Sequence, residues 1–313
     1  MLDDSVQHLI VPFASCSSDD WLQATSPIEL KNLGHLLRGM KLADTDSGQA
    51  DSLCPPHERV LARACGLSSD VDGLMPWAAY EAKADLHEGW AFVTPCHWAM
   101  GREHATLTDP ATLDMRQAES RTLLAAMQPY FATEGITLHY LEPTCWLAQG
   151  EVFRSLPTAS LDRVLGRNVD RWLPPSKAIK LLQNEMQMLL YTHPINDERA
   201  AQGQRTVNSF WASGSGALTA SANGNPQVNV NVTRVLAPAA LSNDWAAYAQ
   251  AWTQLDGTVI AQLLTQQNSG KTVRLSLCGE SHAMTFDTVR HGMLTTLKNA
   301  LSPHKPMSWL KQL

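Results

Sequence analysis

Charged residues are scarce in this chain, and several patterns that mark whole classes of protein are missing from it. Asp, Glu, Lys and Arg make up 17% of the 313 residues, and the formal net charge is −6. A net negative charge argues against nucleic acid or an anionic membrane surface as the main partner. No apolar run approaches the roughly 20 residues that a membrane-spanning helix needs. We therefore expect neither nucleic acid nor membrane as a partner.

The cysteines form no recognisable metal or redox motif. None of the six stands in a CxxC pair, and they are scattered over the whole length. The chain starts with Met-Leu-Asp-Asp, which is acidic where a secretory signal is basic. We therefore expect reduced, buried thiols and a cytoplasmic location. The cysteines are Cys16, Cys54, Cys65, Cys96, Cys145 and Cys278.

Common catalytic and cofactor motifs are missing as well. The sequence contains no GxGxxG or GKS phosphate-binding loop and no HExxH zinc motif. We therefore expect no cofactor and no bound metal.

Apolar residues, in contrast, are plentiful, at 44% of the chain. Strand-like stretches at 7–13, 91–95 and 272–278 alternate with helical patterns such as 115–133. No low-complexity linker interrupts them. This interleaving predicts an α/β (or α+β) fold with a mixed central sheet flanked by helices, and a single domain over residues 1–313.

Three further segments carry specific expectations. Residues 227–235 alternate strictly between valine and polar residues, which predicts a half-exposed strand. Residues 39–53 are polar and acidic, which predicts a mobile loop. Arg163, Arg167 and Arg171 would share one face of a helix, either as a solvated, salt-bridged face or as an anion-binding face.

The segment 171–216 holds most of the functional signal. Ser176 is a candidate N-cap, and Pro194 should end the following helix near Thr192. The helical spacing predicts full burial of Leu182, Met186 and Leu189, with Leu181, Met188 and Leu190 widening the same face.

The residues after this helix resemble a segment of the archaeal-type cofactor-independent phosphoglycerate mutases. The matching residues are His193-Pro194-Ile195-Asn196, Arg199, Gly203, Val207-Asn208, Trp211, Gly214 and Gly216. Over most of its length the chain also resembles a bacterial family described as RpfE-type regulatory or phosphoglycerate-mutase-like proteins. The stretches that carry this second resemblance are 8–15, 94–110, 129–138 and 159–174.

The resemblance implies an ancestry in phosphoester chemistry. Those mutases belong to the alkaline-phosphatase-like metalloenzymes, which use two divalent metals, an Asp-Gly motif after the first strand, a nucleophilic serine and Asp/His clusters. Here Ala14-Ser15-Cys16 follows the first strand, and Cys278-Gly279-Glu280-Ser281-His282 stands where a later ligand motif is expected. The chain thus departs from the family at the positions where the metals would be held.

A candidate anion pocket can still be built on the resembling segment. We expect Asn196, Arg199, Asn208 and the backbone of Gly214 to Gly216 to converge on a small phosphorylated or carboxylated metabolite. His193 would lie at the pocket wall, because ligands usually sit at strand ends in α/β sheets. Alternatively, the same residues fix a buried turn, with Asn196 as a cap and Arg199 paired to Asp197 or Glu198.

Three functions fit these observations. The first is a catalytically degenerate phosphoglycerate-mutase-like protein that binds an anionic metabolite or a partner in a regulatory role. The second is an active metal-dependent phosphoglycerate mutase or phosphotransfer enzyme. The third is a protein–protein interaction module. The sequence makes no prediction about oligomeric state.

Overall fold

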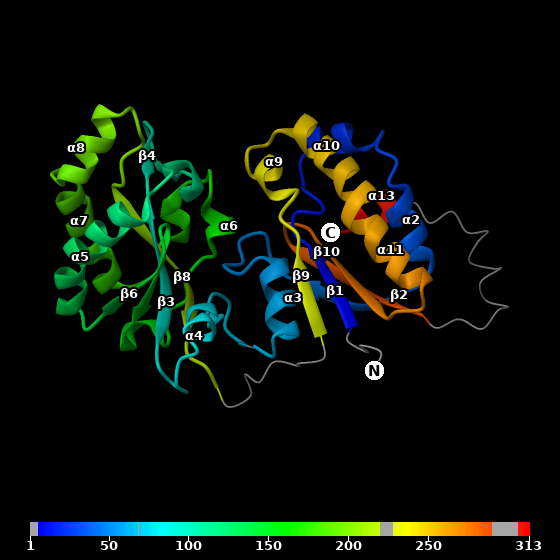
Figure 1. Cartoon of the computed structure of the whole chain (residues 1–313), viewed down its shortest axis with the longest axis horizontal. Coiled ribbons are helices and arrows are strands. Elements are labelled where there is room, and N and C mark those ends of the chain that lie inside the picture. Colours follow the sequence, from blue (N-terminus) through cyan, green and yellow to red (C-terminus); the bar gives the residue numbers. More distant parts are fainter. Residues whose placement is uncertain (1–5, 68, 220–227, 290–305) are drawn as a thin grey trace. The chain divides into compact units, whose positions relative to one another are not determined.

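The structure is a computed structural model that describes residues 6–67, 69–219, 228–289 and 306–313 (Figure 1). The chain divides into two compact units. Unit 1 comprises Met1–Asp51, Pro55–Gly66 and Gly224–Leu313, and unit 2 comprises Ser52–Cys54 and Leu67–Asn223. Each unit is described by itself. That residues 1–313 act as one phosphoglycerate-mutase-like domain stays a prediction.

A five-stranded mixed sheet forms the centre of unit 1, with strand order β2-β11-β10-β1-β9. Strand β1 lies between β9 and β10 and runs parallel to both, whereas β11 is antiparallel to β10 and to β2. The predicted α/β class with a mixed sheet is thereby confirmed. The strands are β1 (Val6–Val11), β2 (Met40–Ser47), β9 (Val228–Val232), β10 (Val273–Cys278) and β11 (His282–Thr288).

Helices cover both faces of this sheet. On one face, apolar residues of β1 and β10 such as Leu9 and Leu275 share a buried cluster with residues of α1, α2, α10 and α11. Helices α2, α10 and α11 are seen over this face in Figure 1. On the other face, Ile10 packs against Val60 of α3. The helices of unit 1 are α1 (Asp19–Thr25), α2 (Lys31–Arg38), α3 (Pro56–Ala64), α9 (Ala237–Leu241), α10 (Trp245–Leu255), η4 (Asp256–Ile260), α11 (Ala261–Asn268) and α13 (Pro306–Leu310).

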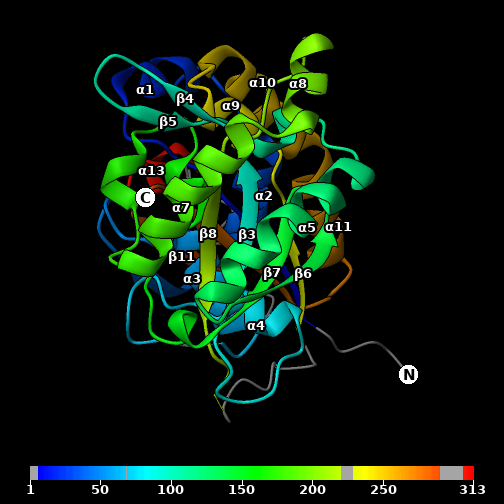
Figure 2. The ribbon, with the colours of Figure 1, turned by 90° about the vertical axis from the view of Figure 1, so that its left-hand side faces the viewer.

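Unit 2 is built on an antiparallel sheet of order β6-β7-β3-β8, with a separate β4-β5 hairpin. Helices α5 and α7 lie against one face of this sheet (Figure 2). Phe131 of α5 contacts Phe210 of β8 with ring centroids 5.1 Å apart. The strands are β3 (Trp90–Cys96), β4 (Trp98–Met100), β5 (Ala105–Leu107), β6 (Thr137–Glu142), β7 (Cys145–Gln149) and β8 (Ser209–Gly216). The helices are α4 (Trp77–Glu81), η1 (Pro110–Leu113), α5 (Gln117–Thr133), η2 (Glu151–Phe153), α6 (Leu161–Val164), η3 (Val169–Trp172), α7 (Lys177–Tyr191) and α8 (Pro194–Ala201).

The ends of α7 lie where capping chemistry predicts them. Ser176 Oγ accepts a hydrogen bond from the Ile179 N–H at 3.3 Å, as an N-cap should. The helix ends at Tyr191, with Thr192 as its C-cap, just before Pro194. None of the helices among the residues described has the length and apolarity needed to cross a membrane.

The segment predicted as a mobile loop is mostly a strand. Residues 40–47 form β2, which pairs with β11 along its length. The acidic side chain of Asp46 forms ion pairs with Arg59 and Arg63 of α3, each at 2.5 Å. Composition suggested a solvated loop, but the basic partners of this acidic residue lie on a helix that follows later in the sequence.

The prediction for the buried face of α7 is wrong in part. Leu182 and Met186 are fully buried as expected, but Leu189 is only half-buried, and Leu190 takes its place. Leu181 is 50% exposed and Met188 is 77% exposed. Helix α7 packs against α5 and β8 on one side only, so its buried stripe is narrower than its apolar stripe.

Two other expectations have mixed outcomes. Arg163, Arg167 and Arg171 do not share a helical face, because α6 ends at Val164 and η3 begins at Val169. The predicted strand at 227–235 is confirmed as the shorter β9. The turn expected at 221–226 lies outside the described residues.

Candidate functional site

His193 begins α8. Its Nδ1 accepts a hydrogen bond from the Ile195 N–H at 3.3 Å, and Pro194 occupies the first turn, where its missing N–H costs nothing. The N-cap role expected for Asn196 is therefore filled by His193, three residues earlier.

Asn196 ties three stretches of backbone together. Its side chain is 7% exposed. Nδ2 donates to the carbonyls of Leu190 and Val207 at 2.7 and 2.6 Å, and Oδ1 accepts from the Val207 N–H at 2.9 Å. The amide thus joins the last turn of α7 to the chain that enters β8.

Arg199 is buried at 1% exposure and spans the same region. Its Nε donates to the Arg205 carbonyl at 2.8 Å, one terminal nitrogen donates to the Leu113 carbonyl, and the other lies 3.3 Å from Glu119 Oε2. Burial would raise the pKa of Glu119, but hydrogen bonds from Arg116 and the charge of Arg199 lower it below its usual value. The carboxylate partner is Glu119, rather than the Asp197 or Glu198 that the turn-fixing alternative named.

Asn208 and the two glycines of β8 also have defined structural roles. Asn208 accepts from the Trp98 N–H at 2.7 Å and donates to the Trp98 carbonyl at 2.9 Å. Gly214 has a φ of 60°, and a Cβ there would lie 2.8 Å from the Phe92 ring. Gly216 has a φ of 141° and faces Pro76. A side chain at either position would be strained.

The six predicted site residues lie along α8 and β8 of unit 2, but they do not all converge. Asn208 precedes the first residue of β8, which pairs with the Cys96 end of β3, whereas Gly216 pairs with Trp90 at the other end. Gly214 and Gly216 are therefore separated from Asn196 and Asn208 by most of the length of β8. The polar side-chain atoms of Asn196, Arg199 and Asn208 are engaged with main-chain groups or with Glu119. Contacts of this type are what the buried-turn alternative expects, although the partners differ from those it named. Ligand binding by His193, Asn196, Arg199, Asn208, Gly214 and Gly216 stays a prediction.

A second candidate location is the carboxyl edge of the parallel strands in unit 1. Because β1 and β10 are parallel neighbours, the loops that follow them must meet. The Ala14 N–H donates to the Cys278 carbonyl at 2.7 Å, and Ser17 Oγ donates to Glu280 Oε2. The two loops that the family resemblance singled out are thus in contact. Ser17 was missed by sequence reasoning, because a serine in a loop carries no periodic signal.

The chain turns sharply as it leaves β1. Phe13 has a φ of 55°, which is unusual for a bulky residue. Its carbonyl accepts from Tyr248 Oη at 2.6 Å, and its ring lies 5.6 Å from that of His57. Burial raises the pKa of Tyr248 well above its ordinary value, so the phenol stays a donor. These contacts hold the edge loop in place.

The turn between β10 and β11 packs against the last residues of unit 1. The His282 N–H donates to the Leu313 carbonyl at 3.3 Å, and a Cβ on Gly279 would lie 2.7 Å from that oxygen. Trp309 contacts Phe286 edge to face at 5.3 Å. The turn that carries Glu280 is therefore fixed on two sides.

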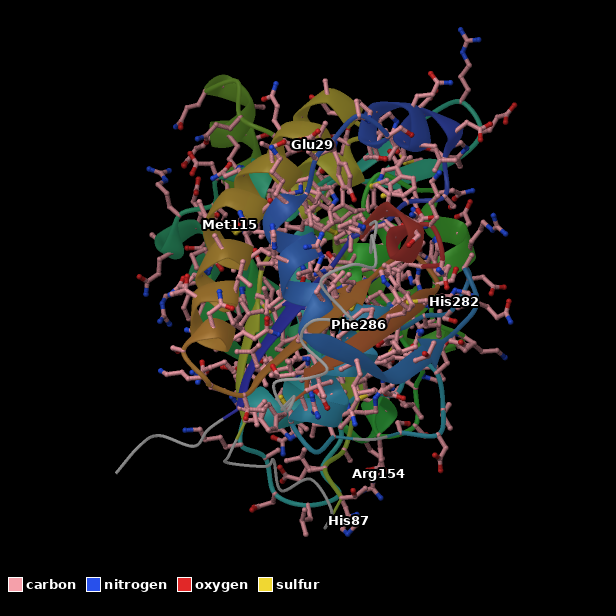
Figure 3. The ribbon with its side chains drawn as sticks, turned by 90° about the vertical axis from the view of Figure 1, so that its right-hand side faces the viewer. Glu29, His87, Met115, Arg154, His282 and Phe286 are labelled. Carbon is pink, nitrogen blue, oxygen red and sulfur yellow. The ribbon has the colours of Figure 1, made fainter. Side chains whose placement is uncertain are left out.

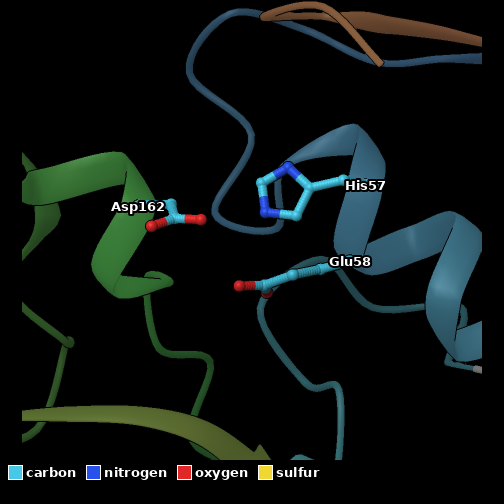
Figure 4. Close-up of side chains that lie close together, drawn as sticks. All are labelled: His57, Glu58 and Asp162. Atoms are coloured by element: carbon cyan, nitrogen blue, oxygen red, sulfur yellow. The ribbon is translucent and has the colours of Figure 1, made fainter. Parts of the chain in front are cut away.

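The residues at this edge do not fit the pair of divalent metals that the family resemblance implies. A two-metal site needs several ligands that hold both ions a few ångströms apart. Here the strand-end loops contribute one carboxylate, Glu280, beside serine hydroxyls. His57 and Glu58 begin α3 in unit 1, and Figure 4 draws them with Asp162, which belongs to α6 of unit 2. Within either unit taken alone, the described residues hold no three His, Cys, Asp or Glu ligand atoms within 4.8 Å of one another.

Comparison with known proteins gives similar solved structures, including the following two. No family model and no curated protein matches the chain. The PH0037 protein from Pyrococcus horikoshii is 12% identical, with a TM-score of 0.49 over 95% of this chain and 93% of that one. A cofactor-independent phosphoglycerate mutase from Thermoplasma acidophilum DSM 1728 is 13% identical, with a TM-score of 0.36 over 99% of both chains. Both TM-scores are below 0.5, so neither likeness carries an argument about function.

Proposed function

We propose that this chain is a catalytically degenerate relative of the phosphoglycerate mutases that acts by binding. Its ligand is a small anionic metabolite, phosphorylated or carboxylated, or a partner bound in a regulatory role. The family assignment rests on the sequence resemblance, and the loss of catalysis rests on the strand-end residues of unit 1.

One observation carries the proposal. The loops after β1 and β10 meet through Ser17 and Glu280, where the family would place metal ligands. The contact between these two loops supports a common ancestry of this sheet edge and the metal-binding edge of the phosphoglycerate mutases. Serine hydroxyls are weak ligands for divalent metals, and one carboxylate cannot bridge two ions while also completing both coordination shells. The residues at this sheet edge therefore favour a ligand-binding function over metal-assisted phosphoryl transfer.

An interaction module is the second candidate, and one feature favours it. Helix α7 leaves Leu181, Met188 and Tyr191 exposed, the last at 86%. Exposed apolar side chains on one helix often mark contact with another protein. A binding protein of this kind would respond to no small anion.

Three measurements on the full chain separate the candidates. Elemental analysis gives the bound metal content, and a coupled assay with added Mn²⁺ follows interconversion of 2- and 3-phosphoglycerate. Thermal unfolding is then followed with phosphoglycerates and sugar phosphates, against sodium sulfate at matched ionic strength. A ligand that binds only the folded state raises the melting temperature. We expect no stoichiometric metal pair, no interconversion above background, and a rise in melting temperature with at least one phosphorylated ligand.

Two outcomes would overturn the proposal. A stoichiometric metal pair, together with turnover that Glu280→Gln abolishes, would establish the active enzyme. A melting temperature that no phosphorylated or carboxylated compound changes, with no activity, would leave the interaction module as the explanation.

A further inference from the structure

A cavity in unit 2 opens where three separate parts of the chain meet. The turn at 86–89 leads into β3, residues 135–137 begin β6, and residues 149–154 follow β7. The cavity has a volume of about 390 Å³, which lies in the range of small-molecule sites. His87 and Arg154 line it and are labelled at the same end of the molecule in Figure 3.

Two glycines bring backbone segments together at this cavity. The Gly150 N–H donates to the Gly89 carbonyl at 2.9 Å. A Cβ on Gly89 would lie 2.5 Å from the Gly150 oxygen and 2.7 Å from the Arg154 nitrogen, so no other residue fits there. The cavity wall is thus rigid backbone at this point.

His87, which lines the cavity, has an uncommon backbone conformation. His87 has a φ of 72°, which is in the left-handed region, and its N–H donates to the Leu218 carbonyl at 3.1 Å. Backbone outliers of this kind are concentrated at ligand-binding positions, where surrounding contacts hold them.

Glu88 is the group that defines the chemistry of the cavity. It is half-buried, and both carboxylate oxygens are fixed by neutral donors. Trp90 Nε1 donates to one oxygen at 3.2 Å, and Gln149 Nε2 donates to the other at 3.1 Å. Glu88 forms no ion pair with any residue that the structure describes. The nearby Arg154 is instead paired with Glu151 at 2.7 Å.

A half-buried carboxylate that accepts only neutral hydrogen bonds keeps its charge available to a cation. We propose that this cavity binds a small organic molecule whose primary ammonium group pairs with Glu88. Each carboxylate oxygen has lone pairs left after its one hydrogen bond, so an ammonium can donate charge-assisted bonds to it. An organic cation fits better than a metal ion, because within unit 2 the described residues offer no three ligand atoms close together. The cavity has room for a molecule of amino-acid to amino-sugar size.

The test compares amines with their acetylated counterparts on the full-length protein. Isothermal titration calorimetry is run with D-glucosamine and with glycine, each against its N-acetyl derivative, which keeps the rest of the molecule but loses the positive charge. We expect at least one amine to bind and its derivative not to bind. Binding by glucosamine alone identifies an amino sugar as the ligand type, and binding by glycine alone identifies an amino acid.

Two variants locate the binding. Glu88→Gln keeps the shape of the side chain and one of its two accepted hydrogen bonds, because the amide oxygen accepts but the amide nitrogen does not. It removes the charge, so the dissociation constant should rise roughly tenfold or more. Glu142→Gln changes an exposed glutamate of β6 that does not line the cavity, and it should bind like the parent. The proposal is overturned if neither amine binds the parent, if the acetylated compounds bind equally well, or if folded Glu88→Gln binds like the parent. Because the ligand pairs test the parent itself, a poorly folded variant leaves the test decisive. None of these outcomes depends on phosphorylated ligands or on activity, so the result is independent of the proposed function.

Discussion

At the scale of single residues, the role of a buried charged side chain such as Arg199 could not be predicted from the sequence, because its partner is distant in the chain. The type and spacing of Arg199 suggested a ligand-binding guanidinium, yet the side chain lies among the largest that are fully buried. Its carboxylate partner, Glu119, stands 80 positions earlier in the sequence. No local pattern links positions so far apart, so this pairing could not be predicted from the sequence.

Replacing Arg199 with alanine should lower the free energy of unfolding by roughly 3–5 kcal/mol, because it leaves Glu119 and the Leu113 carbonyl without their partner. Chemical denaturation measures the change. Arg116→Ala is the matched control, since that guanidinium is 65% exposed and pairs with the same carboxylate. Its cost should be much smaller, because an exposed ion pair is largely screened by solvent. An Arg199→Ala protein that is as stable as its parent but no longer stabilised by anions would instead support the predicted anion pocket.

His8 should make unit 1 sensitive to acid. It is 3% exposed, and its Nε2 lies 2.8 Å from Ser276 Oγ. Burial, and then the charge of Arg274, lowers the pKa of His8 from 6.5 to about 4, against a smaller opposite effect of Asp287. The unfolded chain therefore binds a proton below about pH 6.5 that the folded chain does not bind until near pH 4. Stability contributed by neutral His8 is present at pH 7 and is lost as the pH falls through this window.

The expected loss from His8 is about 2–3 kcal/mol between pH 7 and pH 4.5. His8→Gln keeps a hydrogen-bonding side chain beside Ser276 without a titratable group, so its stability should fall less steeply than that of the parent. His35→Gln alters an exposed histidine of the same unit and should follow the parent curve. Identical slopes for the parent and His8→Gln would show that His8 does not titrate in this range.

At the scale of elements, the ends of α7 could be predicted from the sequence more accurately than the set of residues on its buried face. A serine cap and a proline stop act within a few residues, so both could be predicted. The width of the buried face depends on how many neighbours pack on the helix, which sequence periodicity does not encode. The strand β2 was missed for a related reason, since its stability depends on pairing with β11 and on arginines of α3.

Substitutions along α7 should separate its two faces. Leu190→Ala removes a side chain at 0% exposure and should cost roughly 2–5 kcal/mol of unfolding free energy. Met188→Ala removes one that is 77% exposed and should change stability by about 0.5 kcal/mol or less. Urea denaturation of both variants provides the comparison. Equal costs at the two positions would mean that α7 is rotated relative to the arrangement described.

At the scale of the whole molecule, the fold class could be read from the interleaved patterns, but the candidate sites could only partly be found. The resemblance pointed to the loops after β1 and β10, and parallel pairing brings them together at Ser17 and Glu280. The cavity at Glu88 gave no sequence signal. Its three segments are separated by tens of residues, and it exists only because two glycines allow their backbones to meet.

The division into two units predicts a fragment that folds by itself. The core of unit 2 consists of residues between Ala91 and Ala212, so a fragment of residues 67–223 contains all of it. This fragment should unfold cooperatively, as followed by tryptophan fluorescence and calorimetry. A fragment of residues 1–66 should not, because it has β1 and β2 without the three strands between and beside them. A broad, non-cooperative melt of the 67–223 fragment would contradict the prediction.

The position of β1 between β9 and β10 has a consequence for biosynthesis. Strand β1 is synthesised before β9 and β10, with which it pairs. Val6 gains its partner only when Val228 is made, and Gln7 only when Val273 is made. At usual rates of translation this delay is on the order of 10–50 s. During that time the apolar strand has no hydrogen-bonding neighbour, while the chain of unit 2 is already complete enough to fold. Nascent chains stalled before residue 228 should therefore engage holding chaperones through their N-terminal strand.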